Sequence, residues 1–339
     1  MNQRLLAKIA IGAALACLCV NSTVLAATQG ELSGPLYVKN FSPIAGLLGL
    51  PSQRVAYTQA AGSYGLGVHS SIASHYVAEA GSLERLNLDG ETARYALELR
   101  VGLADNWDIQ LEIPWLDHSG GHLDNVIEGW HDLWGMPDGG RSAVAQDILN
   151  FHYVNPTSRF SLTDDTSGLG DIQLSVSHAF YRGDNSVASV ALGYKFATGD
   201  EDALLGSGED DAYVALRFSD EHLADLPLSW HGQLGYLYAG SSAVLGSRQE
   251  RGLWFAGLSL DWRVTQQISL FAQLDMHGAL LDSKITALGD EAILGSLGGR
   301  WRFAGNWALD ISFVEDLRVE TGPDITFQAS IRYGGSTRH

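Results

Sequence analysis

The sequence predicts an all-β protein, a transmembrane antiparallel β-barrel of about twelve strands, with short periplasmic turns and long extracellular loops. Three observations predict this fold. The chain begins with an export signal, apolar and polar side chains then alternate in segments of about ten residues, and short connections alternate with long ones. No apolar run long enough for a transmembrane helix follows Val20, so any membrane-spanning part must consist of strands.

Residues 1–26 have the features of a signal peptide. Two basic residues precede the apolar run 9–20, and small residues surround Ala26 and Ala27, after one of which we expect cleavage. The run is shorter than the roughly 20 residues that span a bilayer. Export of the mature chain is therefore predicted.

The same segment contains both cysteines of the chain, Cys17 and Cys19, so no disulfide is expected in the mature protein. Lipoprotein processing before Cys17 is the alternative, but Ala14 occupies a position where that signal has a large aliphatic residue. The signal peptide carries two of the 21 basic residues and none of the 39 acidic ones, which leaves a net charge of −20. This charge argues against nucleic acid and anionic substrates as partners.

Alternating segments predict β-hairpins about ten residues tall. In the clearest case, apolar side chains alternate with polar or small ones over residues 95–104 and, after Asp105-Asn106, again over residues 107–116. Two further hairpins surround residues 264–267 and 304–306. Additional strands are expected at residues 66–77, 172–181, 187–197, 212–218, 228–238 and 325–333. These strands give a count of twelve. Residues 55–61 are either a further strand or part of the first one, so a count of fourteen is the alternative.

Long connections rich in Gly, Ser and acidic residues separate the hairpins. They are residues 79–91, 117–170, 198–210, 239–251, 281–291 and 315–324. A soluble sandwich has no reason to place all its long loops at one end, whereas an outer-membrane barrel does. We therefore expect residues 28–54 to be a periplasmic or lumen-inserted segment, residues 55–334 to be the barrel, and residues 335–339 to be a C-terminal extension.

The polar faces of the strands are expected to line a wet lumen in which opposite charges pair across neighbouring strands. The side chains assigned to these faces are Glu98, Arg100, Asp108, Gln110, Glu112, Gln173, His178, Lys195, Arg217, Gln233, Asp261, Arg263, Gln273, Asp275, Arg300, Arg302 and Asp310. Next to the short turns, four tryptophans suggest an aromatic girdle at the periplasmic interface; they are Trp107, Trp262, Trp301 and Trp307.

The long loop 117–170 holds the candidate binding residues. Its apolar stripe at helical spacing includes Leu123, Ile127, Trp130 and Trp134, which would favour an apolar ligand if it lined an opening. Packing against other loops is the plainer interpretation. The metal-ligating side chain types in the same stretch are His118, His122, Asp124 and His131, but their spacing matches no established zinc motif.

Acidic loop tips at residues 164–165, 200–202 and 209–211 could hold calcium loosely and bridge to lipopolysaccharide phosphates, although solvated loops explain them as well. No resident cofactor is expected. Catalysis would need a serine and a histidine in contact. Within His69-Ser70-Ser71, only Ser71 shares a strand face with His69, and neighbouring Ser177 and His178 point to opposite faces.

Several motifs resemble those of an uncharacterised bacterial family of outer-membrane barrels, catalogued as a domain of unknown function. They are Gly34-Pro35-Leu36, the Asn-x-x-Pro step from Asn40 to Pro43, Gly120-Gly121 through Gly139-Gly140-Arg141, Gly168-Leu169-Gly170-Asp171 and Thr198-Gly199-Asp200. The last two are also similar to segments of hydrophobic-compound channels. The final strand resembles the C-terminal signal for barrel assembly, except that residues 334–339 follow its last aromatic residue.

These observations predict a non-enzymatic channel or binding protein of the outer membrane for a small solute, apolar if the tryptophan-rich stripe lines the opening. The alternatives are a lipid hydrolase that uses His69 and a surface structural or adhesion barrel. Outer-membrane lipid, lipopolysaccharide and the barrel assembly machinery are the expected partners. The oligomeric state is left open.

Overall fold

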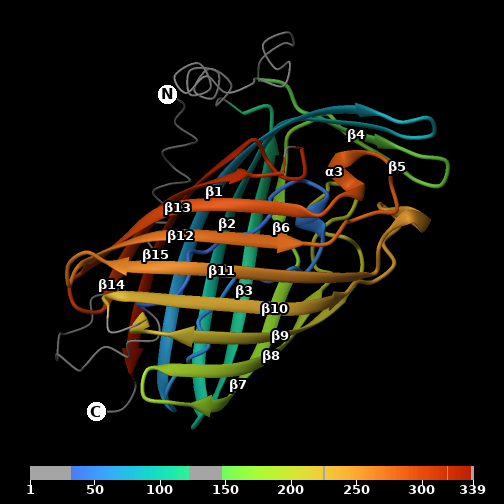
Figure 1. The fold of residues 1–339 in the computed structure, drawn as a ribbon. Helices are drawn as coiled ribbons and strands as arrows, with labels where there is room; N and C mark the ends of the chain where they lie inside the picture. The colour runs from blue at the N-terminus through green and yellow to red at the C-terminus, as the bar shows by residue number, and fades with distance from the viewer. Residues whose placement is uncertain (1–31, 122–146, 224–225, 319, 337–339) are drawn as a thin grey trace.

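The computed structural model describes residues 32–121, 147–223, 226–318 and 320–336 of the chain. Within these ranges, one 15-stranded sheet closes into a barrel (Figure 1). The strands of the wall are β1 (Ser63–Ala80), β2 (Arg85–Ala104), β3 (Trp107–Ser119), β7 (Ile172–Arg182), β8 (Ser186–Phe196), β9 (Asp211–Asp220), β10 (Leu228–Tyr238), β11 (Gly252–Arg263), β12 (Ile268–His277), β13 (Ala292–Phe303), β14 (Trp307–Asp316) and β15 (Ile325–Ser336). None of the helices in these ranges has the length and apolar character needed to cross a membrane.

The barrel closes between its first and last strands. β1 and β15 pair antiparallel from Ser63 opposite Ser336 to Ser74 opposite Ile325. Each wall strand also pairs antiparallel with the next, with β7 following β3. Closure satisfies backbone N–H and C=O groups without water, as a lipid environment requires. The predicted twelve-stranded barrel is confirmed, and residues 55–61 add no strand to it.

Short and long connections alternate around the barrel as predicted, except that only residues 81–84 join β1 to β2, where a long loop was expected. Asp105-Asn106 joins β2 to β3, and Asn106 has a φ of 65°, a left-handed conformation that asparagine tolerates in tight turns. Short turns mark the periplasmic end of such barrels and long loops the extracellular end. Ser63 and Ser336, where the wall begins and ends, lie at the periplasmic end.

Two predicted loops contain strands. Residues 85–91 belong to β2, whose extracellular part pairs with β4 (Asn150–Val154). Leu86 and Leu88 of β2 are buried in an apolar cluster with β4. The alternation of apolar and polar side chains along β2 therefore continues above the lipid. Within loop 117–170, β4 pairs with β5 (Arg159–Leu162), and β6 (Thr166–Leu169) pairs with the upper end of β3.

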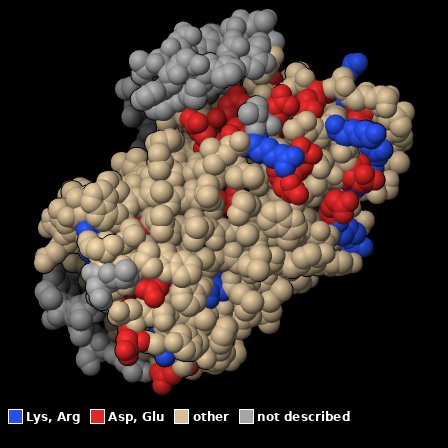
Figure 2. Space-filling model, in the orientation of Figure 1, with Lys and Arg blue, Asp and Glu red and all other residues tan. Residues whose placement is uncertain are grey.

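Large apolar side chains cover the outer surface of the wall. Leu192, Leu216 and Ile311 are more than half exposed, and charged residues gather mainly toward the two ends of the face shown in Figure 2. An apolar belt of this extent is suited to lipid rather than water. Trp107 and Trp301 are exposed beside the short turns, where the aromatic girdle was predicted.

The inner face is polar, and its charges pair between neighbouring strands as predicted. Arg300 on β13 contacts Asp310 on β14 at 2.6 Å, for example. The assignment of His178 to this face is wrong. Ser175 and Ser177 are the buried inward positions of β7, so strand alternation turns His178 outward, where its ring stacks on Trp107 at 4.2 Å.

Candidate functional site

The N-terminal residues 32–62, here called the plug segment, lie inside the barrel (the blue trace in Figure 1). Arg300 donates hydrogen bonds to the carbonyls of Leu32 and Gly34 near the periplasmic end. The chain then rises to the short 3-10 helix η1 (Ala45–Leu47) near the extracellular end and descends again to Ser63. The segment therefore runs along the lumen twice.

Ion pairs attach the plug segment to β2 and β3 at mid-height. Lys39 lies 3.1 Å from Glu112 on β3, and Arg94 on β2 contacts the same carboxylate at 2.6 Å. Arg54, on the descending arm, pairs with Glu98 through both of its terminal nitrogens. All these side chains are at most 10% exposed, so the pairs are only weakly screened by solvent.

A buried lysine holds the top of the plug segment. The ammonium group of Lys195 on β8 donates to the carbonyl of Leu47 at 2.8 Å and contacts Asp171 and Asp211 at 2.8 and 3.3 Å. Asp211 in turn accepts a hydrogen bond from the backbone N–H of Gly49 at 2.7 Å. We call Lys195, Asp171 and Asp211 the latch, because they bind the backbone of the turn that follows η1.

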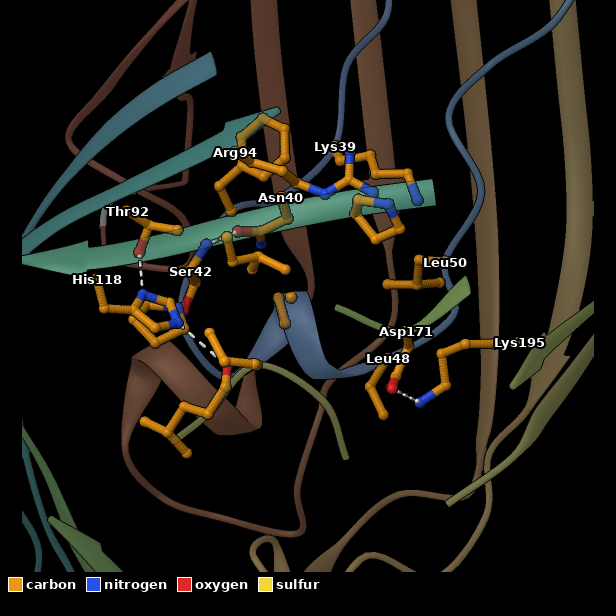
Figure 3. A pocket seen from close by; sticks show the side chains of 18 of the residues that line it. Lys39, Asn40, Ser42, Leu48, Leu50, Thr92, Arg94, His118, Asp171 and Lys195 are labelled. Atoms are coloured by element: carbon orange, nitrogen blue, oxygen red, sulfur yellow. Dashed lines mark hydrogen bonds and ion pairs between the residues drawn. The ribbon is translucent and has the colours of Figure 1, made fainter. Parts of the chain in front are cut away.

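A cavity lies between the plug segment and the wall at this height (Figure 3). The volume of the cavity that the centre of a water molecule can occupy is about 40 Å³. Thr92, Arg94 and Lys195 supply polar groups to it, and Leu48 and Leu116 supply apolar ones. This space suits a few water molecules or one small polar molecule, but not a large solute.

Two of the motifs that resemble the family of outer-membrane barrels meet beside the latch. They are Gly168-Leu169-Gly170-Asp171 and Thr198-Gly199-Asp200. One carboxylate oxygen of Asp171 accepts the backbone N–H groups of Thr198 and Gly199 at 3.0 and 2.9 Å. The hydroxyl of Thr198 donates to the carbonyl of Gly170 at 2.8 Å. A Cβ at Gly170 would lie 2.2 Å from a methyl carbon of Leu116, so a larger residue cannot fit there without displacing Leu116. The motifs therefore form a structural joint that orients Asp171 toward Lys195.

Packed loops cover the extracellular end above the plug segment. Glu84, between β1 and β2, accepts hydrogen bonds from Tyr153 and Ser283 at 3.1 and 2.7 Å and pairs with Arg248. Burial raises the pKa of Glu84, but these hydrogen bonds outweigh that effect and hold the pKa below its ordinary value. Leu47 of the plug segment belongs to the apolar cluster beneath these loops.

His69, the histidine considered for lipid hydrolysis, contacts the hydroxyl of Ser330 and not that of Ser71. His69 Nδ1 lies 2.8 Å from the hydroxyl of Ser330, whereas Ser71 makes no hydrogen bond with His69. Glu98 is 3.3 Å from the other ring nitrogen, but it already pairs with Arg54. The ring of Tyr37 stacks on His69 at 3.9 Å, which leaves no room for a substrate on that face. This arrangement fits a wall-to-plug contact, not an accessible catalytic group.

Of the residues predicted to bind a ligand or a metal, only His118 lies within the described ranges. Leu123, Ile127, Trp130, Trp134, His122, Asp124 and His131 lie outside the described residues. His118 is buried at the upper end of β3, where its two ring nitrogens contact Thr92 and the carbonyl of Leu204 at 3.0 and 3.1 Å. A metal ion would have to displace one of these contacts. Within the ranges that the structure covers, no three His, Cys, Asp or Glu side chains are grouped to hold a metal.

One of the three acidic tips considered for calcium, residues 209–211, has carboxylates with other partners. Asp211 faces the lumen as part of the latch. Asp210 accepts hydrogen bonds from the backbone N–H of Ala197 and the hydroxyl of Tyr194, which hold the pKa of Asp210 below its ordinary value.

Lys195 lies on the inner face, as strand alternation predicts, but its role in the latch does not follow from that pattern. The feature of the sequence that could have indicated this role is that Lys195 is the single charged residue of β8 and lies between outward-facing Tyr194 and Phe196. Lys39 and Arg54 were missed because residues 32–62 have no strand periodicity. Their charges do complement the excess of carboxylates on β2 and β3 around Glu98 and Glu112.

Comparison with known proteins agrees with the barrel. A solved structure of the COG4313 outer membrane channel from Pseudomonas putida F1 has a TM-score of 0.55 and 16% identity, and the alignment covers 83% of this chain and 97% of that one. The NanC porin has a TM-score of 0.45 at 9% identity, covering 80% and 99%. The CymD monoaromatic hydrocarbon channel has a TM-score of 0.40 at 11% identity, covering 93% and 97%. At 16% identity, the likeness to the COG4313 channel concerns the fold alone. No curated protein sequence matches this chain.

The closed barrel with its apolar belt places the protein in the outer membrane. The predicted resemblance to an uncharacterised family of outer-membrane barrels is also confirmed. Because a family profile matches residues 10–334, the chain belongs to the family described as "Protein of unknown function (DUF3187)".

Proposed function

We propose that the protein is an outer-membrane channel for a small solute, closed by its own plug segment. The observation that carries the proposal is that residues 32–62 fill a largely polar lumen and are attached to its wall by ion pairs and hydrogen bonds along both arms, besides apolar contacts such as those of Leu36 and Leu47. Polar contacts of this kind can be exchanged for contacts with water, unlike the contacts of an apolar core. The plug segment can therefore leave a lumen that water then fills.

The size of the barrel supports the same proposal. Eight strands enclose an interior that side chains alone can fill, whereas this wall has twelve. Here the plug segment occupies the additional space, and its backbone is bound by wall side chains such as Gln273, Ser219 and Asp108. Without the plug segment, the lumen would be lined by the polar side chains that now hold it.

The decisive experiment compares the full-length protein with a variant that lacks residues 32–60, in planar bilayers and in liposome-swelling assays. The deletion should give stable conductance and admit small sugars, while the full-length protein opens rarely. Circular dichroism and heat-dependent migration in gels establish that the deleted barrel is folded. A folded deletion variant that neither conducts nor admits sugars would contradict the proposal.

A disulfide supplies a second test that leaves the whole chain in place. A Cβ added at Gly49 would lie 3.2 Å from the Cβ of Asp211, about 0.3 Å short of the range usual for disulfides. The G49C/D211C variant should therefore be silent when oxidised and should open after reduction. The single variant G49C is the control and should not respond to reductant.

The choice of solute stays a prediction. An apolar solute was predicted from the stripe that includes Trp130 and Trp134, which lies outside the described residues. A surface structural or adhesion barrel is the second candidate, favoured by the packed loops around Glu84. It predicts that the folded deletion variant does not conduct and that the intact protein binds cells or matrix through its acidic loops.

We also propose that export removes residues 1–26 or 1–27 and that the mature barrel contacts lipopolysaccharide and the barrel assembly machinery. The basic residues and apolar run at the N-terminus support the first point. N-terminal sequencing of the protein from outer membranes tests it, and a retained leader would contradict it.

A further inference from the structure

Arg217 is a buried arginine of the lumen whose hydrogen-bond partners among the described residues are neutral side chains. Arg217 on β9 is 4% exposed, and its guanidinium donates to the side-chain oxygen of Gln233 at 2.9 Å and to the hydroxyl of Ser177 at 3.3 Å. Within the described ranges, no Asp or Glu forms an ion pair with it. By contrast, Arg300 and Arg332 both contact Asp310, and Arg100 contacts Asp108.

The surrounding charges increase this imbalance. The group that extends from mid-height down to the short turn between β2 and β3, here called the mid-height group, contains five basic side chains, Lys39, Arg54, Arg94, Arg100 and Arg217, and three acidic ones, Glu98, Asp108 and Glu112. Its net charge is therefore +2, in a chain whose overall net charge is −18. Unbalanced positive charge is costly where burial keeps water away, so this region favours a bound negative ion.

A small cavity adjoins Arg217. It lies between the plug segment and the wall and has room for the centres of water-sized molecules over about 10 Å³, roughly one such molecule. Arg54 and Ser52 border it from the plug segment, and Arg217 and Ser175 border it from the wall. Glu112 also borders it.

The Glu112 carboxylate does not exclude an anion, because positive groups already surround it. It lies 3.1 Å from Lys39 and 2.6 Å from Arg94, and it accepts a hydrogen bond from the hydroxyl of Tyr37 at 3.1 Å. Among the described side chains that border this cavity, the guanidinium of Arg217 therefore carries the charge that no ion pair compensates.

We propose that this cavity is a binding site for a small inorganic monoanion of the size of chloride, held by Arg217. The plug segment forms one side of the site, so the anion belongs to the closed state and adds to the contacts between plug and wall. The site requires no channel activity and can be tested on the closed protein.

The test uses full-length protein in detergent, with thermal unfolding followed by circular dichroism. Sodium gluconate, whose anion is too large for the cavity, is replaced stepwise by sodium chloride at constant ionic strength. A ligand that binds only the folded state raises the unfolding midpoint, so we expect a saturable increase with chloride. R217K keeps the charge and should keep most of this increase, whereas R217Q should lose it.

R318Q is the matched control for the loss of one positive charge. Arg318 is exposed and pairs with Asp290 and Glu291, far from the cavity in the fold, so this variant should respond to chloride like the wild type. A wild-type protein that is insensitive to chloride would overturn the proposal, as would an R217Q variant that responds like the wild type.

Bromide soaked into crystals of the wild-type protein gives a measurement that does not depend on any variant folding. An anomalous peak beside the guanidinium of Arg217 is the expected result, and peaks confined to the protein surface would overturn the proposal. Neither measurement uses conductance. Failure here would leave the channel proposal standing, and a non-conducting deletion variant would leave the anion site standing.

Discussion

Lys195 is the wall side chain whose loss should release the plug segment most strongly. In K195M, the two latch carboxylates, Asp171 and Asp211, lose their buried counterion, and the carbonyl of Leu47 loses its donor. Removing one partner of a buried ion pair costs about 3–5 kcal/mol. Because about 1.4 kcal/mol corresponds to a tenfold change, the ratio of docked to released plug should fall roughly 100- to 4,000-fold if the cost falls on the docked state alone.

A cysteine at Ala45 reports this release. Ala45 is 2% exposed in η1, and both natural cysteines lie in the predicted signal peptide, so a thiol reagent labels only the introduced side chain of the processed protein. We expect A45C to be labelled far faster when combined with K195M, and the open probability in bilayers to rise in parallel. K284M changes an exposed loop lysine and should leave both unchanged. Equal labelling rates with and without K195M would refute the assigned role of Lys195.

Two further predictions concern stability. Glu84 has a lowered pKa, so its contribution is fully present above its ordinary pKa of 4.5 and is lost as the pH falls through the lowered value. The unfolding midpoints of wild type and E84Q should therefore differ near pH 7 and converge in acid, and a difference that persists in acid would contradict this. A Cβ at Gly102 would lie 2.0 Å from the carbonyl oxygen of Ala60, so G102A should destabilise the folded protein by about 1–3 kcal/mol in denaturant titrations. The control G299A meets only ordinary contacts at 3.5 Å or more and should be nearly neutral, so equal effects of the two substitutions would count against steric exclusion.

The strands of the wall could be predicted because their alternation of apolar and polar side chains is a pattern of neighbouring residues in the sequence. On β3, Trp107 and Ile109 alternate with Asp108 and Gln110, and this pattern alone determines which side chains meet lipid. The same rule explains the error at His178, which was placed by its polarity although strand alternation turns it outward. Polarity is a weak guide beside the membrane interface, where a ring such as Trp107 can cover a polar neighbour.

The plug segment could not be located in this way because its partners are distant in the sequence. The backbone of Leu36 hydrogen-bonds to Gln273, and the side chain of Asn40 contacts His277, in both cases 237 residues away. An irregular segment has no periodicity that would reveal such partners. The sequence does contain the complementary charges of the two partners. Lys39 and Arg54 are basic residues of the plug segment, and their partners on β2 and β3 are carboxylates.

That division of charge leads to a last prediction, which links the plug segment to the anion site. Lys39 and Arg54 belong to the plug segment, so its deletion leaves three basic and three acidic side chains in the mid-height group. Deletion also removes one side of the cavity at Arg217 and admits water to the guanidinium. The variant lacking residues 32–60 should therefore show no chloride-dependent increase in its unfolding midpoint, while keeping a folded barrel. If the deleted barrel responded to chloride as the full-length protein does, the anion would have to bind elsewhere, because neither the surplus charge nor the enclosed cavity would remain.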